Sequence, residues 1–209
     1  MDVYISELAN FELAKYLKGL GHNIKLVKKS DYVQSPISSH ADIYMCKLKD
    51  GIYFGDKAKL SSKYPNDVLY NAAWVGKYFI CSKYTDKDLI NAAKSIIVQV
   101  SQGYVKCNLL VIDDSHVITE DLGIYKTLCE KTDLSCLLIN PREVKLPGFE
   151  YGFIGGCAGR IAKEIIFNGD ISKHSSYKDI KAFIESCGLG IKYFKDYDLT
   201  DIGSIIASE

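Results

Sequence analysis

Four segments of the chain share one order of hydrophobic and polar positions. Each has a small or polar start, an apolar stretch, a turn, and a second β-rich stretch that ends in polar residues. The segments are ADIYMCKLKDGIYFGD (41–56), YNAAWVGKYFICSK (70–83), KCNLLVIDDSHVITED (106–121) and GCAGRIAKEIIFNGD (156–170). Short apolar stretches bounded by turn residues are typical of strands. Each segment therefore predicts a β-hairpin, and the four together predict an internal repeat.

A helical segment and another strand follow three of these hairpins. The pairs are KDLINAAKS with IIVQV, LGIYKTLCEK with SCLLIN, and YKDIKAFIESCG with IKYFK. In the last helix the apolar residues Ile180, Phe183, Ile184 and Cys187 recur at helical spacing, and Gly188 ends it. The repeating unit is therefore a two-stranded hairpin, a helix and a strand.

The two ends of the chain complete the count of units. The segment FELAKYLKGLGHNIKLVK (11–28) predicts a helix and a strand, with a helical period over residues 1–22, and LTDIGSIIAS (199–208) predicts a last strand. Together they form a fifth unit, and five units around an axis leave no sheet edge exposed. We therefore predict an α/β fold, a five-bladed propeller of ββαβ units in one domain spanning residues 1–209. The alternative is an ordinary α/β sandwich with coincidentally similar hairpins.

Composition narrows the classes of protein. Lys plus Arg and Asp plus Glu both number 26, so no net charge favours nucleic acid. The seven cysteines are widely spread without a CxxC pair, which is typical of reduced thiols in a cytosol. We expect no secretory leader, because the first residues carry acids in place of a basic segment followed by an apolar run, and 18 apolar residues nowhere follow one another. We expect a cytoplasmic protein without nucleic-acid or membrane partners; its oligomeric state is left open.

The predicted propeller brings distant residues together. The first strand of each unit would run beside the axis, so the residues that lead into the five first strands should meet at one central opening. They are His40, Asp42, Asn71, Lys106, Cys107, Gly155, Gly156, Cys157 and Asp201. A thiol, an imidazole and carboxylates would thus share one cleft.

At this point the sequence resembles the penteins, or guanidino-group-modifying enzymes, which include arginine deiminase, agmatine deiminase and dimethylarginine dimethylaminohydrolase. The resemblance covers the whole chain at the level of the repeated unit. It is carried by HADIYMCKL, QGYVKC, LPGFEYGFIGG, FNGD and DIGSII and looks closest to a compact bacterial (clostridial-type) branch. It implies a catalytic cysteine two blades after the histidine, and an acid that orients the histidine one blade before it. Cys107 and Asp201 occupy these places relative to His40. Glycine stands at 155 and 156, where family members carry a substrate-binding carboxylate.

The chemistry implied is attack of a Cys107 thiolate on an amidine or guanidine carbon. Lys106 beside Cys107 and His40 opposite it are expected to lower the pKa of the thiol. His40 would act as the acid and base, Asp201 would orient it, and Asp42 would bind a cationic substrate group. Each residue has a structural alternative. Cys107 could be a buried thiol, His40 could bond backbone at the head of a strand, and Asp201 could terminate a turn.

Other residues are weaker candidates. Cys157 is a rival nucleophile, and Arg160 could anchor an anion, although a solvated strand arginine is the simpler interpretation. Asn71, Lys106, Gly156, Cys157 and Arg160 complete the predicted substrate-binding set. His22, His116 and His174 are placed at the surface, with no cysteine or histidine partner at metal-ligand spacing, so we expect no metal and no cofactor.

Two functions remain open. The first is a cysteine-dependent hydrolase or amidinotransferase-like enzyme that acts on an amidine- or guanidine-type C–N bond of a small molecule. The second is a non-catalytic pentein-fold protein whose rim binds a macromolecular partner. The first predicts an open channel with a reactive thiol, and the second predicts an inert Cys107.

Overall fold

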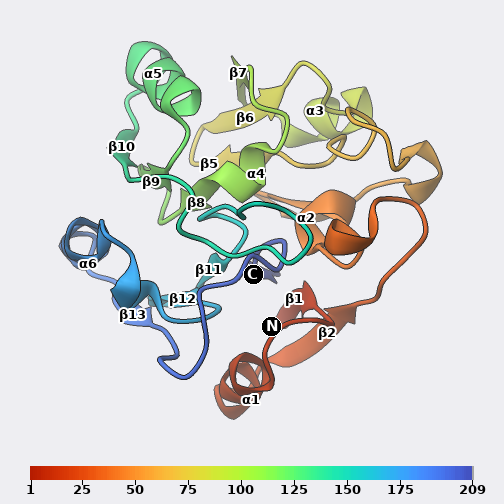
Figure 1. Cartoon of the computed structure of the whole chain (residues 1–209). Coiled ribbons are helices and arrows are strands. Elements are labelled where there is room, and N and C mark those ends of the chain that lie inside the picture. The colour runs from red at the N-terminus through yellow and green to blue at the C-terminus, as the bar shows by residue number, and fades with distance from the viewer. Residues whose placement is uncertain (209) are drawn as a thin grey trace.

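The computed structural model describes residues 1–208 and contains five small β-sheets arranged around a common centre (Figure 1). Three sheets are complete ββαβ units. In each, the first two strands are antiparallel, and the strand after the helix is parallel to the second. The units are β5 (Ala73–Val75), β6 (Tyr78–Ser82), α3 (Lys87–Ala93) and β7 (Ile96–Val100); β8 (Leu109–Val111), β9 (His116–Thr119), α5 (Leu122–Lys131) and β10 (Ser135–Leu138); and β11 (Ala158–Ile161), β12 (Glu164–Phe167), α6 (Tyr177–Ser186) and β13 (Gly190–Lys192).

The other two sheets differ from this pattern. The first hairpin, β3 (Met45–Leu48) and β4 (Gly51–Phe54), stands without a helix. The last sheet joins both ends of the chain: β14 (Ile206–Ala207) pairs antiparallel with β1 (Asp2–Ser6), which is parallel to β2 (Asn23–Val27) across α1 (Phe11–Gly19). A backbone hydrogen bond from Ser208 N to Asp2 O, 2.9 Å, extends this pairing.

The strand β1 corrects the prediction of a helical period over residues 1–22. Val3 and Ile5 are fully buried, whereas Asp2 and Tyr4 are only partly covered, and this alternation is that of a strand. The helix begins only at Phe11, because the Asn10 side chain accepts a hydrogen bond from Glu12 N and so caps it.

The first strands of neighbouring sheets lie beside one another around the centre. β3 contacts β5, β5 contacts β8, β8 contacts β11, and β11 contacts β14. A small apolar cluster of Ala41, Met45 and Ile206 connects the last sheet back to the first. The predicted five-bladed α/β propeller is confirmed, and the sandwich alternative is wrong.

Short helical turns precede two of these central strands. They are α2 (Ala41–Tyr44) and α4 (Val105–Asn108), and the 3₁₀ turns η1 (Ser35–Ile37), η2 (Lys57–Lys59) and η3 (Ile171–Lys173) lie in other connections. His40 is the residue before α2, so it does not stand at the head of a strand as predicted. All four residues of α2 are buried, as are Val105, Cys107 and Asn108 of α4, just before the chain enters the strand.

Two further observations bear on the sequence analysis. His174 is buried and its Nδ1 accepts a hydrogen bond from Ser176 N, 3.0 Å, so its predicted surface position is wrong. Among residues 1–208, no helix combines the length and the apolar character needed to cross a membrane.

Candidate active site

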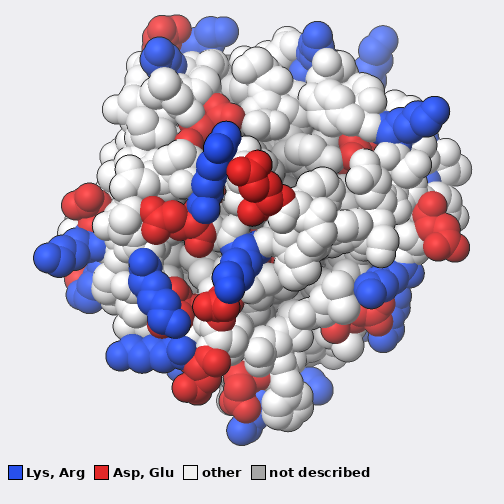
Figure 2. All heavy atoms as spheres, in the orientation of Figure 1, with Lys and Arg blue, Asp and Glu red and all other residues white. Residues whose placement is uncertain are grey.

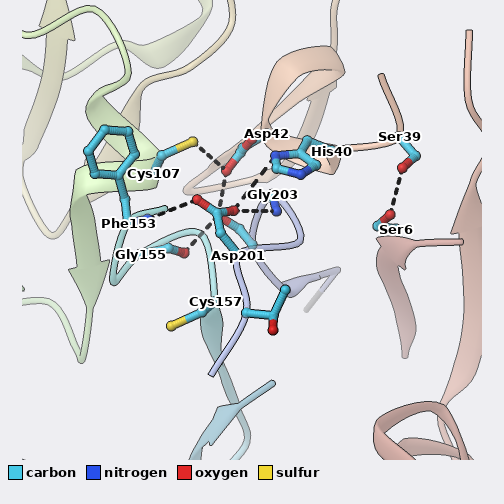
Figure 3. A network of polar contacts seen from close by, with 12 residues as sticks. Ser6, Ser39, His40, Asp42, Cys107, Phe153, Gly155, Cys157, Asp201 and Gly203 are labelled. Carbon is cyan, nitrogen blue, oxygen red and sulfur yellow. Dashed lines mark hydrogen bonds and ion pairs between the residues drawn. The ribbon is translucent and has the colours of Figure 1, made fainter. Parts of the chain in front are cut away.

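A cavity of about 300 Å³ lies at the end of the propeller axis where the one-turn helices meet. Its polar lining includes His40, Cys107 and Asp201, from three parts of the chain. Figure 3 shows the side chains of these residues and of Asp42 pointing toward one another. The structure thus brings together the four residues that the sequence analysis placed at the centre of the site.

The Cys107 thiol is held between two polar side chains. It donates to Asp42 Oδ2, 3.2 Å away, and accepts from Asn71 Nδ2, also 3.2 Å away. Asn71 Oδ1 in turn accepts from the backbone N–H groups of Lys106 and Cys107, at 2.7 and 3.3 Å. Asn71 therefore fixes both the one-turn helix that carries the thiol and the direction of its sulfur.

Asp42 is fully buried, and one of its carboxylate oxygens is committed. Oδ2 accepts from Ser204 Oγ at 2.7 Å as well as from Cys107. Oδ1 is buried and has no hydrogen-bond partner in the described part of the chain. A buried carboxylate oxygen without a donor is costly, so a donor group brought next to Asp42 Oδ1 would be stabilised.

His40 faces Asp201. The distance from His40 Nδ1 to Asp201 Oδ1 is 3.7 Å, and both side chains are almost fully buried. Asp201 also accepts from Phe153 N at 3.0 Å and from Gly203 N at 2.9 Å. Asp201 therefore does both things considered for it: it binds the backbone amides of nearby turns, and it faces the imidazole.

Two glycines allow this close packing. A Cβ at Gly156 would lie 2.2 Å from Asp201 Oδ1, and a Cβ at Gly203 would lie 2.1 Å from His40 Cβ. Gly203 also has φ +71°, a conformation that residues with a side chain rarely adopt. Gly156 thus contacts Asp201 through its backbone, in place of the carboxylate that the family pattern would supply there.

The electrostatics of the site keep the thiol neutral. Burial, followed by the charges of Asp42 and Asp201, raises the pKa of Cys107 well above its usual value. Burial lowers the pKa of His40, although Asp42 opposes this. Burial raises the pKa of Asp201 to about 6. The predicted lowering of the thiol pKa by Lys106 and His40 is therefore wrong for the protein without a ligand.

The position of Lys106 explains in part why the pKa of Cys107 is not lowered as predicted. Its ammonium group donates to Gly155 O at 3.2 Å and to Ser204 Oγ at 3.1 Å, and the Ser204 hydroxyl donates onward to Asp42. Lys106 lines a second cavity, of about 260 Å³, bordered by the central strands. Its charge therefore acts on Asp42 through Ser204, and the ammonium makes no contact with the sulfur beside it.

Two residues of the predicted substrate-binding set, Cys157 and Arg160, lie away from the cavity. The Cys157 thiol bonds Ile154 O at 3.2 Å within the apolar core, and its sulfur points away from Cys107 (Figure 3). Arg160 donates to the carbonyls of Ala162 and Ile112, at 3.1 and 3.2 Å. Packing of whole blades, which the sequence pattern does not specify, turns these residues away.

Other parts of the cavity wall were not predicted as functional. The segment before the fourth hairpin contributes Leu146, Phe149, Glu150, Tyr151 and Phe153 to the lining. Ser204 was missed as well, although it stands three residues after Asp201 in DIGSII. The only signal for these residues was their presence in the segments LPGFEYGFIGG and DIGSII. A separate group of potential metal ligands, Asp113, His116 and Cys187, lies outside this cavity.

Comparison with solved structures supports the same fold. The chain is similar to a Cys-to-Ser mutant of DDAH from Pseudomonas aeruginosa complexed with citrulline (TM-score 0.55, 8% identity, 93% of this chain and 91% of that chain). It is also similar to a dimethylarginine dimethylaminohydrolase adduct with 4-chloro-2-hydroxymethylpyridine (TM-score 0.52, 10% identity, 93% and 92%). A third similar structure is C. jejuni agmatine deiminase (TM-score 0.50, 10% identity, 92% and 75%).

At these identities the likeness shows the fold alone, which is the pentein fold. No curated protein matches the sequence. A family model described as a family of unknown function (DUF6873) matches residues 50–206. The chain therefore belongs to the DUF6873 family and has the pentein fold.

Proposed function

We propose that this protein is a cysteine-dependent hydrolase that cleaves an amidine- or guanidine-type C–N bond of a small cationic molecule. The observation that carries the proposal is the contact between Cys107 and Asp42, in which a neutral thiol that lines the cavity donates to a buried carboxylate with one unpartnered oxygen. This arrangement holds a weak nucleophile beside a binding position for a cation, and the bound cation activates the Cys107 thiol.

Binding of the substrate is the first step. An amidinium group donates to Asp42 Oδ1, which has no other donor among the described residues, and its positive charge lies close to Cys107. This charge offsets the effect of Asp42 and Asp201, so the pKa of the thiol falls when substrate is bound. His40, neutral because burial lowers its pKa, is the nearby base that accepts the thiol proton.

Hydrolysis then proceeds in two covalent steps. The Cys107 thiolate adds to the amidine carbon, and protonated His40 gives its proton to the leaving nitrogen, which departs as an amine or ammonia. A water molecule attacks the resulting thioester-like carbon, again with His40 as base, and the thiol leaves. The sum is hydrolysis of one C–N bond, with Asp201 holding the imidazole in position.

The cavity wall defines the substrate class further. Aromatic and aliphatic side chains surround the catalytic group, and Glu150 is the acid toward the outside. No Lys or Arg is among the residues that line it in the described chain. An amidine or guanidine with an apolar substituent, and without a carboxylate, therefore fits the wall better than a free amino acid.

The second candidate function is a binding protein without catalysis. On the face shown in Figure 2, acidic and basic side chains are interspersed, without one broad area of a single sign. This face thus offers no charge pattern that would favour a macromolecular partner, whereas the polar groups converge on the cavity.

The test is release of ammonia or amine from a panel of alkyl and aryl amidines and guanidines. We expect turnover by the wild type, loss of turnover in Cys107→Ser, and activity retained in Cys157→Ser, whose thiol lies in the core. Turnover that survives Cys107→Ser, or a folded wild type inert toward the whole panel, would contradict the proposal.

A further inference from the structure

A second cluster of reactive side chains lies between two blades, away from the cavity described above. Asp113 and His116 belong to the tip of the β8–β9 hairpin, and Cys187 ends helix α6 of the next blade. One potential ligand atom from each residue lies within 4.8 Å of the others. From the sequence alone His116 had no ligand partner, because Cys187 is far along the chain and only the ring of blades brings it near.

The hairpin tip holds two of these side chains in a fixed arrangement. Asp113 Oδ1 accepts from the backbone N–H groups of Ser115 and His116, both at 2.8 Å. His116 Nδ1 lies 2.9 Å from Asp113 Oδ1 and 3.1 Å from Oδ2. On the other side, the ring of Phe183 contacts the imidazole edge to face, with centroids 5.6 Å apart. The imidazole is therefore oriented by its neighbours.

The third side chain is available to the same space. Cys187 is partly exposed and free, and its thiol bonds Phe183 O at 3.3 Å, one helical turn earlier. Arg160 is near this thiol, but its guanidinium donates to the carbonyls of Ile112 and Ala162. Among the described residues the Cys187 thiol forms no ion pair, so it can turn toward His116 without breaking one.

We propose that Asp113, His116 and Cys187 form a binding site for a divalent transition-metal ion, with Zn²⁺ as the preferred ion. Metal–sulfur bonds of about 2.3 Å and metal–nitrogen or metal–oxygen bonds of about 2.0–2.2 Å place tetrahedral ligand atoms about 3.4–3.6 Å apart. In the structure the three ligand atoms lie within 4.8 Å of one another, and His116 Nδ1 is 2.9 Å from Asp113 Oδ1. Binding an ion would therefore close the wider gaps and open the contact between the imidazole and the carboxylate by about 0.5 Å.

The donor set selects the ion. One thiolate, one neutral imidazole and one carboxylate balance a double positive charge, and their mixed softness suits Zn²⁺ or Co²⁺ better than Mg²⁺ or Ca²⁺. Three protein ligands leave a fourth position to water. The bound ion would connect the β8–β9 hairpin to helix α6, so it would join two neighbouring blades.

The experiment is titration of the full-length protein with Co²⁺ in oxygen-free buffer, followed by the thiolate-to-cobalt charge-transfer absorbance. We expect a single site, displacement of Co²⁺ by Zn²⁺, and binding at least about tenfold weaker in Cys187→Ser. The matched control is Cys129→Ser, at an exposed cysteine outside the cluster, which should bind like the wild type. Absence of the band, or a band kept in Cys187→Ser or lost in Cys129→Ser, would overturn the proposal.

A second measurement needs no variant. Alkylation of the wild type by iodoacetamide, mapped by mass spectrometry, should be about tenfold slower at Cys187 with Zn²⁺ present, and unchanged at Cys129. Equal rates at Cys187 with and without Zn²⁺ would overturn the site even if Cys187→Ser failed to fold.

Discussion

Replacing Asp42 with asparagine is expected to make Cys107 more reactive toward a neutral alkylating agent and to abolish turnover of cationic substrates. Asp42 Oδ2 lies 3.2 Å from the thiol, and its charge raises the pKa of Cys107, second only to burial. Asparagine keeps the size of the side chain and removes the charge. The same substitution removes the carboxylate that would bind the substrate cation.

The distance between Asp42 Oδ2 and the Cys107 sulfur gives the size of the electrostatic effect. Two unit charges 3.2 Å apart interact by about 1.3 kcal/mol in bulk water and by about 5 kcal/mol at an effective dielectric constant of about 20. The smaller value already corresponds to a change of close to tenfold in the fraction of thiolate. We therefore expect iodoacetamide to modify Cys107 at least about tenfold faster in Asp42→Asn near neutral pH.

The assay is residue-resolved mass spectrometry of the alkylated protein at several pH values. Exposed Cys129 serves as the internal reference, and Asp179→Asn, an exposed acid on α6, is the matched control. If folded Asp42→Asn reacts at Cys107 no faster than the wild type, then the carboxylate does not control the thiol. That result would refute the electrostatic description of the site.

Four further predictions concern the same site. Gly203→Ala and Gly188→Ala have matching φ values of +71° and +72°, but only at 203 would the new Cβ meet a neighbour, His40. Urea unfolding should show a cost of about 1–2 kcal/mol for Gly188→Ala with activity kept, and a larger cost with activity lost for Gly203→Ala; equal effects would contradict the packing. Because the pKa of Asp201 is raised from 3.8 to about 6, kcat/KM should fall as the pH drops through about 6, and this limb should disappear in Asp201→Asn. Because the raised pKa makes Asp201 bind its proton more tightly in the folded protein, the unfolding free energy should fall by up to about 3 kcal/mol as the pH rises from 3.8 to about 6. The unfolding free energy of Asp201→Asn minus that of the wild type should therefore rise over this range, and a fall would refute the prediction. Finally, alkylguanidines should exceed arginine in kcat/KM by about tenfold, since the cavity wall offers no described Lys or Arg to a carboxylate; preference for arginine would reverse the proposed substrate class.

The sequence was sufficient to predict the ring of blades because each hairpin and helix carries its own periodic pattern. It failed at residues 2–6, where a five-residue strand is too short for its alternation to stand out from the helical spacing of the residues that follow. That strand is specified by pairing with β2 and with β14 at the other end of the chain. Such pairing over the whole length of the chain leaves no local trace.

The sequence predicted only part of the site, because the rest depends on contacts between distant segments. Counting blades placed His40, Cys107 and Asp201 at one opening, and these three line one cavity. The direction of each side chain depends on packing between blades, so the sequence left Cys157 as a rival nucleophile to Cys107 although its thiol lies in the core. The raised pKa of Cys107 depends on burial and on carboxylates from distant segments, which neighbours in sequence such as Lys106 do not indicate.

Whether Cys107 is a nucleophile toward amidines is tested most directly by comparing its modification by chloroacetamidine and by the neutral chloroacetamide. The two reagents share a leaving group and differ in charge, so the ratio of their rates measures activation of the thiol by a cation bound at Asp42. We predict modification of Cys107 by chloroacetamidine at least about tenfold faster than by chloroacetamide, with the ratio lost in Asp42→Asn. Equal rates for the two reagents, or modification that spares Cys107, would contradict a cation-activated cysteine hydrolase.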